Sequence, residues 1–99
     1  MKDYELSPEA RNDLQDIWTF IAADNIEAAD RLEADIYDAC EALAANPRLG
    51  HKRPDLTAEP VLFWLVRGHY LVIYERATQP LKVARILHGA RDVSSQFGS

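Results

Sequence analysis

The sequence has little of several residues that define common classes of protein. Its 99 residues include one cysteine, Cys40, which excludes an internal disulfide and fits a reducing cytosol. No apolar run approaches the length of a membrane span, and the first residues lack the apolar stretch of a secretory signal. We therefore expect a cytoplasmic protein that has no membrane segment.

Motifs for cofactor and metal chemistry are also missing. The sequence contains no phosphate-binding glycine loop, dinucleotide fingerprint or zinc-finger spacing. The three histidines, His51, His69 and His88, stand far apart, and Cys40 falls on the core stripe of a predicted helix. We expect no metal site and no cofactor.

Charge is unevenly divided along the chain. Residues 1–47 carry a net charge of −9 and residues 48–99 a net charge of +4, which together give the formal −5. Such asymmetry is compatible with contact to a polyanion or an acidic partner, and equally with helix surfaces that are acidic for solubility.

The pattern of apolar residues predicts one domain over residues 1–99. Asp3 to Leu6 is a short strand, and Ser7-Pro8 caps a helix that runs to about Ala23. Asn25 caps a second helix, which ends near Ala45 because Asn46-Pro47 follows. The connection between the helices is short enough to make them an antiparallel hairpin.

The second half of the chain changes to strand patterns. A loop over residues 47–60 holds three prolines and the basic side chains of Arg48, Lys52 and Arg53. Three apolar runs follow, separated by short turns that favour an antiparallel meander: residues 61–66, 70–74 and 81–87. The predicted fold class is α+β, with the order β-α-α-β-β-β and an antiparallel sheet packed on the helical hairpin. The first two runs are apolar on both faces, so the face away from the helices needs a cover or a partner.

Two groups of residues are candidates for function. On a regular last strand, Arg85 points to one face and His88 to the other, so a joint site needs a break in the strand. Arg85, His88 and Arg91, with Lys52 and Arg53, have the chemistry to hold phosphate, and a histidine can act as acid or base in RNA cleavage. The alternative to a functional role is structural: His88 lies at the end of the last strand, and Arg85 forms an ion pair with an acidic residue of a helix.

Aromatic residues form the second group. Phe63 and Trp64 are adjacent in a strand, so one of them faces away from the helices, where it could stack a base or meet a partner helix. The anchor candidates for a partner are the following five, each of which has core packing as its alternative: Trp18, Phe63, Trp64, Tyr70 and Tyr74.

Several segments together resemble the ParE toxins of the ParE/RelE toxin–antitoxin superfamily. They are Leu6-Ser7-Pro8-Glu9-Ala10 with Asp13-Leu14 and Ile17-Trp18, then residues 43–50 and 53–56, then Val72-Ile73-Tyr74, and finally residues 84–92 (Ala84 to Asp92). The match extends over nearly the whole chain in the right order, and its strength lies in the combination.

The resemblance implies a fold, a partner and a target. It implies the β-α-α-β-β-β arrangement, a ParD-like antitoxin that binds the toxin in a hetero-oligomer, and inhibition of DNA gyrase without catalysis. From it and the charges we expect antitoxin or target contacts at Arg48, Lys52, Arg53, Trp64, Tyr74, Arg85, His88 and Arg91.

Two alternatives stay open. A RelE-like ribosome-dependent messenger RNA endonuclease would use His88 and Arg85, although no tyrosine follows Tyr74 and the tail is not basic. A net acidic protein also suits ribosomal RNA poorly, because charge attraction supplies much of RNA affinity. The other alternative is a protein-interaction module without toxicity.

Overall fold

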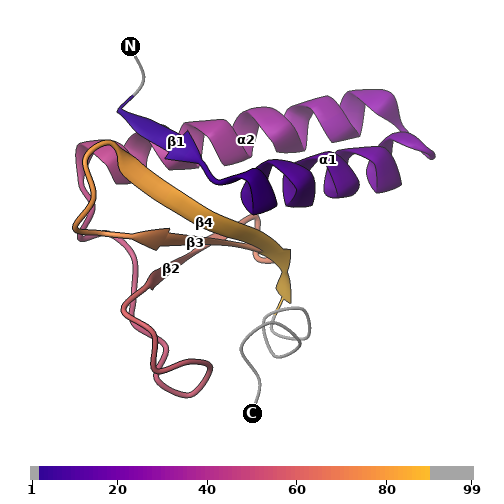
Figure 1. Cartoon of the computed structure of the whole chain (residues 1–99). Helices are drawn as coiled ribbons and strands as arrows, with labels where there is room; N and C mark the ends of the chain where they lie inside the picture. The colour runs from indigo at the N-terminus through magenta and orange to yellow at the C-terminus, as the bar shows by residue number, and fades with distance from the viewer. Residues whose placement is uncertain (1–2, 90–99) are drawn as a thin grey trace.

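The structure, a computed structural model, describes residues 3–89. The six elements follow the predicted order (Figure 1) and are β1 (Tyr4–Leu6), α1 (Pro8–Ala22), α2 (Ile26–Ala45), β2 (Leu62–Val66), β3 (Tyr70–Glu75) and β4 (Leu81–His88). The two helices form a hairpin that packs on one side of a four-stranded sheet. The predicted α+β class and element order are therefore confirmed.

Local capping explains where the helices begin. The Ser7 hydroxyl accepts a hydrogen bond from the Ala10 amide at 3.0 Å, and Pro8 takes the first helical position, where no donor is needed. The Asn25 side chain accepts from the Ala28 amide at 3.0 Å and so starts α2. Both caps agree with the sequence prediction.

The sheet has the strand order β1-β4-β3-β2. The predicted antiparallel meander holds for β2, β3 and β4. In contrast, β1 pairs with β4 in parallel, so the sheet is mixed and the prediction of an entirely antiparallel sheet was wrong at its first strand. The parallel pairing is possible because the helical hairpin provides the long crossover connection that parallel neighbours require.

Apolar side chains fill both faces of the sheet, as the two-sided strands require. The main cluster lies between the sheet and the helices and includes Ile36, Leu43 and Val72. A second cluster on the opposite face contains Phe63, Leu71 and Ile73, and Leu56 from the loop before β2 packs against it. The loop before β2 thus covers part of the sheet face that points away from the helices, which the sequence analysis expected to need a cover or a partner.

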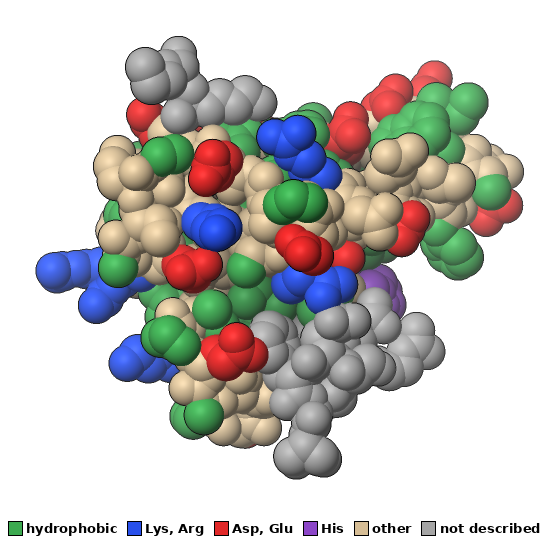
Figure 2. All heavy atoms as spheres, in the orientation of Figure 1, with side chains coloured by type: hydrophobic (Ala, Val, Ile, Leu, Met, Phe, Trp, Pro, Cys, Tyr) green, Lys and Arg blue, Asp and Glu red, His purple; other side chains and the backbone are tan. Residues whose placement is uncertain are grey.

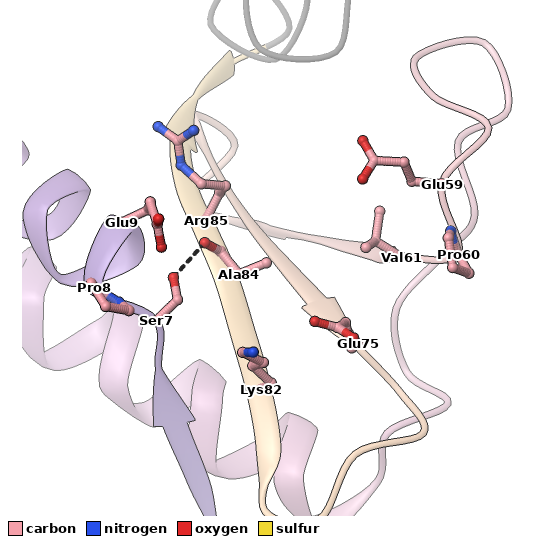
Figure 3. A pocket seen from close by; sticks show the side chains of 10 residues that line it. All are labelled: Ser7, Pro8, Glu9, Glu59, Pro60, Val61, Glu75, Lys82, Ala84 and Arg85. Carbon is pink, nitrogen blue, oxygen red and sulfur yellow. Dashed lines mark hydrogen bonds between the residues drawn. The ribbon is translucent and has the colours of Figure 1, made fainter.

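Helix α1 is bound to the part of β4 that β1 does not reach. Strand β1 pairs only with residues 81–83. Beyond it, the Ser7 hydroxyl donates to the Ala84 carbonyl at 2.7 Å (Figure 3), and the Ile86 amide donates to a carboxylate oxygen of Asp13 at 3.0 Å. The same carboxylate accepts two bonds from Arg85, from Nε at 2.7 Å and from Nη2 at 2.8 Å.

The register of β4 shifts at the same place. Tyr74 lies opposite Val83 and Ile73 lies opposite Arg85, which leaves Ala84 as an extra residue, a β-bulge. Past the bulge Ile86 faces the main cluster and Leu87 faces the second one. The alternation predicted for residues 85–88 is therefore present.

Neither helix in the described part of the chain has the combination of length and apolar character that crossing a membrane requires.

We predict that Asp13→Ala lowers the free energy of unfolding by about 2–3 kcal/mol, because it leaves the partly buried Arg85 guanidinium and the Ile86 amide without their acceptor. Urea denaturation measures the change. Asp16→Ala, an exposed carboxylate on the same helix, serves as the control and is expected to shift stability by less than about 0.5 kcal/mol. Equal effects of the two substitutions would contradict the role given to Asp13.

Alkaline pH should weaken the fold through its tyrosines. Burial, together with Cys40 and nearby carboxylates, raises the pKa of Tyr4 to about 12 from an ordinary 10.0. The neutral phenol is favoured in the folded protein, so this contribution is complete below pH 10 and is lost as pH rises towards 12. Unfolding midpoints measured from pH 8 to pH 11.5 should fall less for Tyr4→Phe than for the wild type. Parallel declines would contradict this assignment, and a remaining decline reflects Tyr37 and Tyr74, whose pKa values burial also raises.

Candidate partner-binding surface

Charge is unevenly distributed in space as well as in sequence. Figure 2 shows acidic side chains at the tip of the helical hairpin and Lys and Arg side chains projecting at the opposite end of the molecule. Of the predicted basic contacts, Arg48 and Lys52 are exposed in the loop before β2. Arg53 lies in the same loop, where its guanidinium pairs with Asp55 at 2.9 Å.

Tyr74 belongs to the core and not to a surface. Its side chain is 0% exposed, so the prediction that it contacts a partner was wrong. The hydroxyl donates to the Pro47 carbonyl at 2.7 Å and accepts from the Gly50 amide at 2.8 Å. Tyr74 therefore holds the start of the basic loop against the sheet, and apolar strand periodicity alone gave no sign of these two bonds.

The adjacent aromatic residues of β2 face opposite sides, as expected. Phe63 faces away from the helices, but it is 2% exposed inside the second cluster and has no surface to offer. Trp64 packs partly buried against the main cluster, and its ring lies 6.4 Å from that of His51 with 24° between the planes. Only Trp64 of this pair keeps accessible surface for a partner.

Arg85 and His88 line two different hollows. Arg85 lies in the hollow drawn in Figure 3, between the start of α1, β4 and the segment before β2. His88 lies at the end of β4, in a hollow with Asp16, Ile17, Phe20 and Tyr70. The structure thus does not bring the two proposed nuclease residues together.

The hollow at Arg85 is not suited to phosphate. Three carboxylates line it, those of Glu9, Glu59 and Glu75, against the cations of Lys82 and Arg85. Hydrogen bonds from Arg85 to Asp13 raise the pKa of the guanidinium and already occupy Nε and Nη2. The pairing of Arg85 with an acidic helix residue is the structural alternative stated above, and it is confirmed.

The hollow at His88 is mainly apolar and includes a residue that the sequence reasoning missed. Phe20 is 81% exposed, the highest value among the large apolar side chains described. Next to it, the His88 ring meets Tyr70 edge-on at 5.0 Å and lies parallel to His69 at 6.3 Å. A large apolar residue that lies outside the core stripe of its own helix was the available signal for Phe20.

Two of the residues predicted to contact a partner, Trp18 and Arg91, have not yet been placed. Trp18 is half-buried, and its indole N–H donates to Asp30 on α2 at 2.9 Å, so it fastens the two helices together. Arg91 lies outside the described residues. Within residues 3–89 no group of three or more His, Cys, Asp or Glu side chains is placed to hold a metal ion.

The described surface therefore presents an exposed apolar patch at Phe20 and, apart from it, the cationic loop residues Arg48 and Lys52, on a small α+β domain. Such surfaces bind macromolecules through apolar anchors and charge steering. The sequence model described as the ParE toxin of the type II toxin–antitoxin system parDE matches residues 4–93. The chain belongs to the ParE toxin family.

Two known proteins are similar along nearly their full length. Toxin ParE1 of Caulobacter vibrioides (strain ATCC 19089 / CIP 103742 / CB 15) is 28% identical over 99 residues, which cover 99% of this chain and all of that protein. A solved structure of the chromosomal ParDE system from P. aeruginosa superimposes with a TM-score of 0.69 at 19% identity, and covers 89% of this chain and 96% of that one. The second likeness supports the fold.

We predict that Tyr74→Phe lowers the free energy of unfolding by about 1–3 kcal/mol, since the Gly50 amide and the Pro47 carbonyl lose their partner. Gly50→Ala should act in the same direction, because the new Cβ would lie 2.4 Å from the tyrosine oxygen. Thermal or urea unfolding measures both. Tyr70→Phe is the control, because the Tyr70 hydroxyl has no hydrogen bond within residues 3–89. A Tyr70→Phe effect as large as that of Tyr74→Phe would contradict this account.

Proposed function

We propose that the protein is a cytoplasmic toxin that inhibits DNA gyrase and is neutralised by a ParD-like antitoxin in a hetero-oligomer. The observation that carries the proposal is the match of the ParE toxin family over residues 4–93, which leaves little of the chain for another activity. Toxin ParE1 and the ParDE structure, each similar over nearly the whole chain, add support.

The antitoxin contact is proposed at the hollow around Phe20. An exposed phenylalanine beside Ile17 and Tyr70 gives a folding segment an apolar anchor that no described part of the chain covers. The cations of Arg48 and Lys52 lie in a separate region and suit the steering of an acidic partner or contact with gyrase.

We propose an inhibitor and not a catalyst. A nuclease needs a cation for phosphate next to an acid or base. Here Arg85 is engaged by Asp13 and lines a different hollow from His88. Within residues 3–89, His88, which is exposed beside His69 and Tyr70, is the feature that favours the RelE-like alternative.

Two assays run side by side on purified protein test the proposal. One follows DNA supercoiling and cleavage by gyrase, and the other follows ribosome-dependent cleavage of messenger RNA. Loss of supercoiling with intact message is expected. Cut message with normal supercoiling would overturn the proposal in favour of the nuclease, and inactivity in both assays, with no growth arrest on expression, would favour a non-toxic interaction module.

We predict that Phe20→Ser weakens antitoxin binding about tenfold or more, which corresponds to about 1.4 kcal/mol, because it removes the apolar anchor. Its high exposure means that stability should hardly change. Calorimetric titration with the antitoxin measures affinity. Ile26→Ser is the matched control, an apolar residue that is 60% exposed but lies outside this hollow, and it should bind within about twofold of wild type. Equal losses in the two variants would contradict the placement.

A further inference from the structure

Three exposed cations in the second half of the chain have no acidic partner within residues 3–89. They are Arg48 and Lys52 in the loop before β2, and Arg76 in the connection between β3 and β4. In contrast, aspartates pair with the guanidinium groups of Arg53, Arg67 and Arg85. The positive charges of the first three are therefore available to an anion.

Arg48 and Arg76 belong to distant segments that come together at the hydroxyl of Tyr74. This hydroxyl bonds the carbonyl of Pro47 and the amide of Gly50, which stand on either side of Arg48 in the chain. Burial raises the pKa of the Tyr74 phenol, while the bond from Gly50 and the charge of Arg76 lower it, so Arg76 is within electrostatic reach of this hydroxyl. Figure 1 accordingly draws the β3–β4 connection beside the end of α2, where the loop begins.

The part of the loop that carries Lys52 is fixed along the outer edge of β2. The His51 amide donates to the Phe63 carbonyl at 2.9 Å, and the Phe63 amide donates to the His51 carbonyl at 2.8 Å. The His51 ring also stacks beside that of Trp64, at 6.4 Å. A backbone held in this way presents its cations without the ordering cost that a free loop has on binding.

The two segments present positive charge without negative charge between. Residues 46–53 and residues 76–80 contain no aspartate or glutamate. Guanidinium and ammonium groups are hydrogen-bond donors only, and they complement phosphate oxygens, which only accept. Double-stranded DNA carries about one negative charge per 1.7 Å of its axis, so it can satisfy several such cations at once, whereas a folded protein would need carboxylates in a matching arrangement.

We propose that Arg48, Lys52 and Arg76 form a surface that binds the phosphodiester backbone of duplex DNA, and that this surface contacts the DNA held by gyrase. The identity of the DNA rests on the proposed function, which the inference deepens, because the toxin then grips the substrate of its target as well as the target. The contact is independent of base sequence, since phosphates carry no sequence information.

The salt dependence of binding to a short, labelled DNA duplex, followed by fluorescence anisotropy, tests the surface directly. Three phosphate contacts predict that the logarithm of the binding constant falls with the logarithm of salt concentration with a slope of about −2.7, or about sixfold for each doubling of salt. Absence of binding at low salt, or binding that salt does not weaken, would overturn the inference. An RNA duplex of the same length is the comparison, and a preference for RNA would also overturn it.

Substitutions identify the cations. Arg76→Gln should make the slope shallower by about one and weaken DNA binding about five- to tenfold at roughly 0.1 M salt, and Arg48→Gln should act alike. Arg31→Gln is the matched control, because it removes the same charge from an exposed position on α2, and it should bind within about twofold of wild type. Equal losses in Arg76→Gln and Arg31→Gln would mean that only net charge matters, and would overturn the surface.

NMR of the two tryptophan indole N–H groups adds a measurement of position. Titration with the duplex should shift the Trp64 signal, because its ring lies beside His51 at the edge of the surface. The Trp18 signal should stay in place, because its indole is bonded to Asp30 between the helices. A shift of Trp18 with Trp64 unchanged would overturn the placement.

Gyrase assays separate this inference from the proposed function. Arg76→Gln should require about five- to tenfold more toxin for half-inhibition of supercoiling, while Arg31→Gln should match wild type. Wild-type toxin that inhibits gyrase without binding the duplex would overturn the inference and leave the proposed function intact. If Arg76→Gln then still loses inhibition, the surface contacts an acidic protein partner instead. DNA binding with the predicted slope but normal supercoiling would support the surface and overturn the function.

Discussion

The fold depends on how α1 is fixed to the free side of β4. A strand in the middle of a sheet needs bonds on both sides, yet β1 is too short to pair with all of β4. Beyond the end of β1, the Ser7 hydroxyl donates to the Ala84 carbonyl of β4, and the Asp13 carboxylate accepts from the Ile86 amide. Asp13 also forms an ion pair with Arg85. One capping residue and one carboxylate thus add specific polar contacts to the apolar packing that places the helical hairpin on the sheet.

This attachment also determines which surfaces remain for binding. The bulge at Ala84 and the Asp13 contact keep Arg85 on the side of α1's first turn, while His88 emerges at the other hollow beside Phe20. The charged hollow at Arg85 and the mainly apolar hollow at His88 are therefore separate, although both residues belong to β4.

Sequence reasoning recovered the elements because their signals are local. Ser7-Pro8 and Asn25 mark helix starts, Asn46-Pro47 marks an end, and all three agree with the structure. The parallel placement of β1 and the two bonds of Tyr74 were missed, because both join residues far apart in the chain. The alternation of β4 was enough to separate Arg85 from His88, but it could not identify Asp13 as the partner.

The separation of charge between the two halves has a consequence for motion in solution. Acidic groups at the hairpin tip and cations at the opposite end give the molecule an electric dipole in addition to its net charge of −5. The electric field of a highly charged neighbouring molecule orients the protein before the two come into contact. Its cationic end then faces an anionic neighbour, and its acidic end faces a cationic one. Dissolved salt shortens the distance over which this turning acts to roughly 8 Å at physiological ionic strength.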